Sequence, residues 1–209
     1  VDLPGFVALK AEFPHLAIYL DDAHGLGTLG DGGGGAAHHF GLVDEVDFIM
    51  GTFSKTFGSI GGFVACNDPQ VAEYLRHNAR TMLFSAGLPA GNVATVLACL
   101  DLLEQQPERV EILRRNIARV KNGYRQLGLP VSGRDSPIIP VLIGDEEMAF
   151  AISRELFEQK VFALPVMYPA VARKKAIIRT TFMSSHSSAQ IDTFLEILET
   201  TLRRHGRIL

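Results

Sequence analysis

Residues 16 to 25 read Leu16-Ala17-Ile18-Tyr19-Leu20-Asp21-Asp22-Ala23-His24-Gly25. The first five form a short apolar run, which is typical of a strand covered on both faces in a parallel α/β sheet. The run ends at Asp21, and His24 follows soon after. Because ligands bind at the carboxyl ends of strands in open α/β sheets, this acid and imidazole indicate a functional site. An isolated match would more often be a capping acid and a surface histidine.

A second motif follows another strand, which we expect at 46–50. It reads Gly51-Thr52-Phe53-Ser54-Lys55-Thr56-Phe57-Gly58. Glycines let the backbone approach a ligand closely, and hydroxyl groups can hydrogen-bond a phosphate. A neutral lysine between them can form a Schiff base. Alone, Lys55 could equally be a solvated loop cation, but the upstream Asp-x-x-His favours a catalytic lysine.

The two motifs together fit pyridoxal phosphate. This cofactor is an electron sink only while its ring nitrogen is protonated, and a buried carboxylate bonded to that nitrogen keeps it so. Asp21 is the candidate carboxylate. His24 could reach the ring hydroxyl or a reacting proton, and Ala23 is small enough for the ring to lie against it. The predicted cofactor site thus comprises Asp21, Ala23, His24, Thr52, Ser54 and Lys55, with no metal.

The rest of the chain predicts an α/β fold of two domains. Further strands are expected at 62–66, 138–143, 161–163 and 176–181. Helices are expected at 69–79, 88–103, 110–127, 146–159 and 189–205. The break at Gln105-Gln106-Pro107 divides the chain into domains 1–105 and 106–209.

Composition favours a globular protein that acts on small molecules. Of the 209 residues, 47% are apolar and 21% charged, and the net charge is −3, which indicates neither disorder nor a nucleic-acid-binding surface. No apolar run reaches the roughly 18 residues of a membrane span. Two cysteines, Cys66 and Cys99, are too few for a disulfide framework and suit a reducing cytoplasm. Because Val1 is not a methionine and a strand follows closely, we expect an upstream portion to be missing.

At these motifs the sequence resembles the α-oxoamine synthases of fold type I. Asp21-Asp22-Ala23-His24 is similar to the family's Asp-Glu-Ala-His, and Gly51–Lys55 to its Gly-Thr-x-x-Lys, in the same order and spacing. With Gly61-Gly62-Phe63-Val64 after it, the second motif looks closest to serine palmitoyltransferases and to synthases of polyketide pathways. The resemblance spans nearly the whole chain. It extends through Phe84–Pro89, near the family's dimer interface, through Ile177–Thr180 and through Ser184–His186.

The resemblance implies a fold type I transferase. Residues 1–105 would be the later part of the large, mostly parallel-sheet domain, and 106–209 the small C-terminal α/β domain. The implied enzyme is a homodimeric, pyridoxal-phosphate-dependent acyltransferase. It would condense an amino acid with an acyl-CoA or acyl-carrier-protein thioester, with loss of CO₂. The family's ring-stacking histidine lies upstream of the part present here.

The resemblance also assigns roles to individual residues. Lys55 would hold the cofactor and move a proton, Asp21 would keep the pyridine protonated, and His24 would bond the ring oxygen. Thr52 and Ser54 would anchor the cofactor or its phosphate. Arg179 would hold the amino-acid carboxylate; the alternative is a structural ion pair on a strand. For His186 a structural role is favoured.

Two departures from the family pattern stand out. Asp22 replaces the usual Glu, a change that we expect to be tolerated. Met167-Tyr168-Pro169 stands where some bacterial serine palmitoyltransferases have Arg-Pro-Pro, which weakens the case for serine and a palmitoyl thioester.

Three alternatives remain beside the synthase. The first is another fold type I enzyme, such as an aminotransferase. The second is a noncatalytic subunit or fragment, against which Lys55 argues. The third is a dinucleotide-binding dehydrogenase, because Gly25–Gly30 is a formal G-x-G-x-x-G. That fingerprint should open a helix at once, and Asp31 followed by four glycines is a poor helix start.

Overall fold

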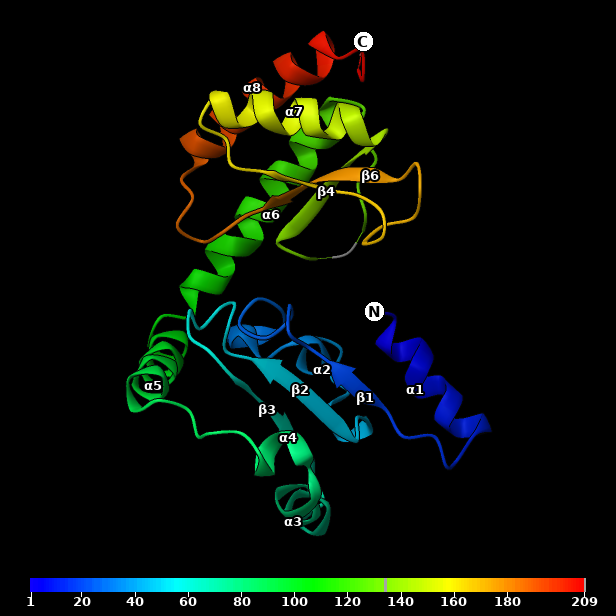
Figure 1. Cartoon of the computed structure of the whole chain (residues 1–209), viewed down its shortest axis with the longest axis vertical. Coiled ribbons are helices and arrows are strands. Elements are labelled where there is room, and N and C mark those ends of the chain that lie inside the picture. The colour runs from blue at the N-terminus through cyan, green and yellow to red at the C-terminus, as the bar shows by residue number, and fades with distance from the viewer. Residues whose placement is uncertain (134, 209) are drawn as a thin grey trace. The chain divides into compact units, whose positions relative to one another are not determined.

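The computed structural model describes residues 1–133 and 135–208. They form two compact units, Val1–Val110 and Glu111–Leu209, which are described separately here (Figure 1). The boundary lies inside helix α6 (Glu108–Gln126) rather than after residue 105. The proline at 107 ends helix α5 (Ala90–Gln105) but starts the next helix immediately, so the break is not itself the boundary.

The first unit is built on a three-stranded sheet in the order β1-β2-β3. Strand β1 (Tyr19–Asp21) is parallel to β2 (Phe48–Thr52), and β2 is antiparallel to β3 (Gly62–Ala65). All three strands were predicted, with β1 shorter than the apolar run and β2 shifted toward its carboxyl end. Because β1 and β2 are parallel, Asp21 and Thr52 end their strands at the same edge of the sheet.

Strand β1 is covered on one face only, which corrects the expectation of a strand buried on both. Leu20 is 4% exposed, whereas its neighbour Tyr19 is 58% exposed and stacks on Phe48. The covered face packs against helices α1 (Leu3–Glu12) and α2 (Ala36–His39). An apolar run does not reveal which side chains find a covering element, because alternate residues of a strand face opposite sides.

Helix α1 was not predicted, although its start carries recognisable signals. The side chain of Asp2 accepts a hydrogen bond from the Gly5 backbone, and Pro4 occupies the first turn. Acidic N-caps and first-turn prolines are typical of helix starts. Past β3, this unit continues with helix α3 (Pro69–Asn78), the short α4 (Arg80–Leu83) and α5.

Helix α1 is tied to the sheet by one ion pair. Lys10 Nζ lies 2.8 Å from Asp47 Oδ2 and donates to the Glu45 carbonyl. The Asp47 carboxylate also accepts from the Ile18 backbone at 2.7 Å, at the start of β1. The hydrogen bond from Lys10, followed by that from Ile18, lowers the pKa of Asp47. Asp47 therefore connects the helix, the strand and the turn before β2.

This ion pair predicts a defined pH dependence of stability. Since the pKa of Asp47 is lower in the folded state, its contribution is present above the unfolded pKa of about 3.9 and is lost as the pH falls through the folded value. We expect the difference in urea midpoint between the intact gene product and its Asp47→Asn variant to be constant above about pH 5 and to shrink below about pH 4. A difference that persists unchanged into the acid range would show that the carboxylate is not shifted.

The second unit has an antiparallel sheet in the order β4-β6-β5. Its strands are β4 (Ile138–Gly144), β5 (Leu164–Val166) and β6 (Ala176–Thr181). Helices α6, α7 (Glu146–Glu158) and α8 (Ser188–Arg204) supply the rest of a buried core that includes Tyr124, Ile152 and Leu198. In β6 the buried side chains are Ala176, Ile178 and Thr180, and the alternate residues form the other face.

Strand β5 lies at 164–166 and not at the predicted 161–163. After α7 the chain turns through Lys160, whose φ is 68°, and Ala163 remains attached to that helix. Its carbonyl accepts from Ser153 Oγ at 2.7 Å, and its side chain is buried. Pairing with β6 begins only at Leu164, opposite Arg179. For most of the other predicted helices and strands, the first and last residues agree with the structure to within about two positions.

Candidate active site

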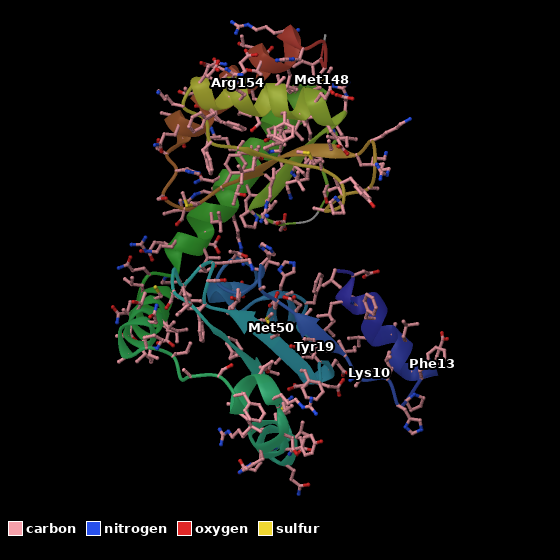
Figure 2. The ribbon with its side chains drawn as sticks, in the orientation of Figure 1. Lys10, Phe13, Tyr19, Met50, Met148 and Arg154 are labelled. Atoms are coloured by element: carbon pink, nitrogen blue, oxygen red, sulfur yellow. The ribbon has the colours of Figure 1, made fainter. Side chains whose placement is uncertain are left out.

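The acid and histidine motif lies where β1 ends. Asp21 is opposite Met50 of β2, and the Asp22 backbone N–H donates to the Met50 carbonyl at 2.9 Å. Figure 2 labels Tyr19 and Met50 on these neighbouring strands. The Asp21 side chain is exposed, in contrast to the buried carboxylate expected, and its Oδ1 accepts from the Ala23 backbone at 3.0 Å. A fixed, accessible carboxylate therefore stands at the strand end.

His24 and Ala23 continue this motif into a turn. The Ala23 side chain is buried and His24 is exposed. The His24 carbonyl accepts from the Thr28 hydroxyl at 2.7 Å, which starts the glycine-rich loop 25–35. This loop contains a short 3₁₀ turn, η1 (Asp31–Gly33), and the four-residue helix α2 comes directly after it. This geometry differs from a dinucleotide fingerprint, which opens directly into a helix.

The lysine motif begins at the end of β2, on the same edge of the sheet. The hydroxyl oxygens of Thr52 and Ser54 are 2.8 Å apart, and Thr52 also donates to the Gly61 carbonyl at 3.2 Å. Lys55 follows with an exposed side chain, for which the described residues offer no hydrogen-bond or ion-pair partner. The loop thus presents an unpaired amine beside two ordered hydroxyl groups.

Thr56 connects the two motifs, a role that the sequence did not reveal. Its hydroxyl donates to the Leu26 carbonyl at 3.0 Å, across 30 positions of the chain. A Cβ atom on Gly27 would overlap the Thr56 side chain. The residue next to Lys55 is therefore packed against the loop that follows His24. The sequence offered only a weak sign of this contact, namely a glycine at 27 and a hydroxyl side chain at 56.

Asp22 is the second residue whose role the sequence did not reveal. Its side chain is buried at 5% exposure, and its Oδ2 accepts from the Ala36 backbone at 2.7 Å. Burial raises the pKa of Asp22, with opposing effects from the hydrogen bonds of Ala36 and Gly25 and a further increase from the charge of Asp21. The sequence had marked this position only as a tolerated replacement for Glu.

Arg179 lies in the second unit, on the central strand β6. Its register partners are Pro140 of β4 and Leu164 of β5. The side chain is exposed on the sheet face opposite the buried Ile178, and it has no ion pair or hydrogen bond within residues 1–133 and 135–208. The structural alternative, an ion pair on the strand, is therefore not seen among the described residues.

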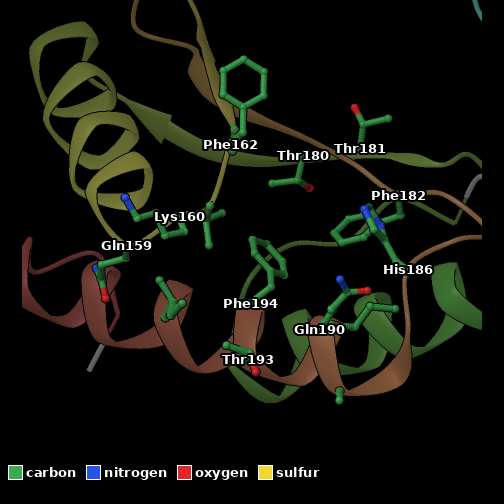
Figure 3. Close-up of a pocket in the computed structure, with 15 residues that line it drawn as sticks. Gln159, Lys160, Phe162, Thr180, Thr181, Phe182, His186, Gln190, Thr193 and Phe194 are labelled. Carbon is green, nitrogen blue, oxygen red and sulfur yellow. The ribbon is translucent and has the colours of Figure 1, made fainter.

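The second unit also contains a pocket of about 450 Å³, which does not include the predicted site residues. Figure 3 shows Phe182, His186 and Phe194 along it, between β6 and α8. His186 Nδ1 accepts from the Met183 backbone, and Asn116 donates to the carbonyls of both. These bonds give His186 a clear place in the packing of the turn before α8.

The described residues contain no group of three or more His, Cys, Asp or Glu side chains placed to hold a metal ion. None of their helices combines the length and the apolar character needed to cross a membrane.

Comparison with known proteins places this geometry in context. Residues 3–198 match the family model "Aminotransferase class I and II". A serine palmitoyltransferase of Sphingobacterium spiritivorum is 41% identical over 94% of this chain and 49% of its own length. For 8-amino-7-oxononanoate synthase 1 of Bacillus velezensis the identity is 39%, over 96% of this chain and 51% of that protein. The chain thus spans about half the length of the curated relatives it matches.

Solved structures agree with the sequence matches. The serine palmitoyltransferase of S. paucimobilis, solved with a bound PLP-myriocin aldimine, has a TM-score of 0.92 and 29% identity, over 99% of this chain and 52% of that one. The fold is therefore that of the fold type I transferases, as predicted. The chain belongs to the aminotransferase class I and II family, and its relatives place it among the α-oxoamine synthases.

Proposed function

We propose that the intact gene product is a pyridoxal-phosphate-dependent acyltransferase of the α-oxoamine synthase type. It would join the α-carbon of an amino acid to the carbonyl carbon of an acyl thioester. The thiol would leave with a proton, and the amino-acid carboxylate would leave as CO₂. A proton taken up at the α-carbon would replace the departed CO₂, so the product is an α-amino ketone.

One observation carries this proposal: the Asp-x-x-His and lysine motifs meet at the carboxyl edge of β1 and β2. The parallel pairing sets Asp21 opposite Met50, and the bond from Thr56 to Leu26 joins the two loops. Ligands of open α/β sheets bind at such an edge. The two motifs come together only when the chain folds. Their proximity therefore supports a shared site independently of their amino-acid sequences.

The residues at this edge fit the proposed cofactor. Pyridoxal phosphate, when bound, supplies an electron sink that makes the amino-acid α-proton acidic. Asp21 offers an exposed carboxylate, which a bound pyridine ring would contact and cover. Lys55 offers an amine that has no hydrogen-bond or ion-pair partner among the described residues, and this amine can hold the aldehyde and take or return a proton. Thr52 and Ser54 offer hydroxyl groups suited to a phosphate or ring oxygen.

The relatives indicate the class of substrates, an amino acid and an acyl thioester, and two kinds of synthase are similar to this chain. Relatives named serine palmitoyltransferase are 40–42% identical to this chain, which favours a serine palmitoyltransferase-like activity. The named 8-amino-7-oxononanoate synthases, at 36–40%, are close behind. An assay of the intact gene product with a panel of amino acids against acyl-CoA and acyl-carrier-protein thioesters would identify the pair. A colourless protein, or one that releases no CO₂ with any pair, would contradict the proposal.

We also propose that the protein is a homodimer, with residues 82–88 at the interface. Met82, Leu83, Phe84 and Leu88 are all exposed in this chain, Phe84 at 85%. Clustered large apolar side chains of this kind mark protein interfaces. The family resemblance of Phe84–Pro89 points to the same segment.

Arg179 is proposed to bind the amino-acid carboxylate. Its guanidinium has no partner within the part of the chain that the structure describes, and it offers two parallel donors, which match a carboxylate. We expect Arg179→Ala to weaken amino-acid binding about ten- to a hundredfold, as charge-assisted hydrogen bonds contribute about 1.5–3 kcal/mol. Arg179→Lys should weaken it less. Spectral titration of the intact gene product with amino acid measures this affinity, and the cofactor spectrum without substrate should not change. An unaltered dissociation constant in Arg179→Ala would remove this arginine from the site.

A further inference from the structure

Asp22 is a buried carboxylate to which the proposed reaction gives no task. Its Oδ2 accepts the N–H of Ala36, the first residue of α2, in a buried 2.7 Å hydrogen bond. Gly35, the N-cap of α2, has no side chain to accept a bond from the helix. The Asp22 carboxylate, 14 positions before Ala36 in the chain, serves as the acceptor instead. The Gly25 N–H donates to the main-chain carbonyl of Asp22 at 3.1 Å, and the Asp22 carboxylate lies against the Gly25 backbone. Asp22 therefore holds both ends of the loop 25–35.

The space around this carboxylate is closed by the loop itself. A Cβ atom on Gly25 or on Gly35 would overlap the Asp22 carboxylate. Gly35 has a φ of 93°, a conformation that favours glycine. Both glycines therefore bring their backbones against the Asp22 carboxylate.

The far side of the loop contacts the lysine motif. The backbones of Leu26 and Gly34 form a bridge, and the Gly27 N–H donates to the Gly33 carbonyl at 2.7 Å. The Leu26 carbonyl in turn accepts the Thr56 hydroxyl. A continuous set of contacts thus runs from Asp22 through the loop to the residue beside Lys55.

We infer that Asp22 is a positioning residue: its buried carboxylate fixes the loop 25–35 and, through Leu26 and Thr56, sets Lys55 relative to Asp21 and His24. The identity of the bound group in this inference rests on the proposed function, whereas the loop contacts are independent of it. Because a buried hydrogen bond to a charged group contributes more than a neutral one, loss of the carboxylate should loosen the loop without removing any group that touches the cofactor.

The first test is amide hydrogen exchange in the intact gene product prepared without cofactor. Asp22→Asn retains the shape but removes the negative charge, so the bond from Ala36 is no longer charge-assisted and an NH₂ group replaces one carboxylate oxygen beside the loop backbone. We expect exchange in peptides covering 25–36 to accelerate about ten- to a hundredfold. Asp22→Glu retains both acceptor oxygens and should restore slow exchange. Asp44→Asn removes an exposed carboxylate from the same unit and serves as the charge-matched control. Unchanged exchange in Asp22→Asn would overturn the inference, whatever the cofactor.

The second test reads the orientation of bound pyridoxal phosphate by visible circular dichroism. We expect a reduced signal per bound cofactor in Asp22→Asn, recovery in Asp22→Glu, and the wild-type signal in Asp44→Asn. If Asp22→Asn does not fold, Thr56→Val tests the same connection at an exposed position; it should reduce the signal while Ala36 remains protected. Loosened exchange with an unchanged circular dichroism signal and unchanged kcat would leave Asp22 a purely structural residue and overturn its positioning role. A wild-type protein without any visible band would contradict the proposed function instead, and the exchange result would still stand.

Discussion

Replacement of Lys55 by alanine is expected to abolish covalent capture of pyridoxal phosphate. Among the described residues the Lys55 amine has no competing hydrogen-bond or ion-pair partner, and its backbone is anchored by the bond from the Gly58 N–H to the Lys55 carbonyl at 3.0 Å. Alanine at this exposed position removes the amine without disturbing a core. Turnover should fall by about 10²- to 10⁴-fold from the loss of proton transfer alone, and further through weaker cofactor retention.

The measurement is borohydride reduction of the intact gene product, followed by mass spectrometry of the peptide that contains residue 55. Wild type should retain the reduced cofactor on this peptide. Lys55→Arg retains a positive charge but cannot form the bond, so it should behave like alanine. Lys174→Ala, at another exposed lysine, is the control. A cofactor adduct that persists in Lys55→Ala would show that a different lysine holds the group.

A second large effect is expected from Asp21→Asn. The substitution removes a charge and little else, because an asparagine oxygen can still accept the 3.0 Å hydrogen bond that Ala23 donates to Asp21. Loss of a catalytic charge contact commonly reduces the rate by about 10²-fold or more. We therefore expect kcat to fall at least that far in the intact gene product, with the melting temperature close to that of wild type.

Steady-state kinetics at measured cofactor occupancy separates this effect from simple loss of cofactor. Asp44→Asn removes a carboxylate from the same unit and should leave kcat unchanged. The contrast with Asp22→Asn is also informative. We expect the exposed Asp21 to affect chemistry with little change in loop exchange, and the buried Asp22 to affect both. Normal turnover of a fully occupied Asp21→Asn variant would exclude Asp21 from the site.

Much of the fold was readable because local patterns and tertiary packing agree. Strand β6 and helices α3, α5, α6, α7 and α8 have the apolar periodicity or the terminal signals of their class. The pattern was less informative where a partner decides the outcome. Strand β5 begins at Leu164 because its ladder forms opposite Arg179, and nothing within 161–166 marks that register.

The chemistry of the candidate site was predicted from the sequence alone. Asp21, His24 and Lys55 follow apolar runs that form strands, and the comparisons confirm the family that the chain was predicted to belong to. Which of the two adjacent carboxylates is buried could not be read from the sequence, because it depends on how the chain packs beyond the strand end. Successive side chains at a strand end point in different directions, so Asp21 remains accessible while Asp22 meets the backbones of Gly25, Gly35 and Ala36. The contact between Thr56 and Leu26 likewise depends on two loops meeting at one sheet edge, since residues 30 positions apart become neighbours only when β1 and β2 pair in parallel.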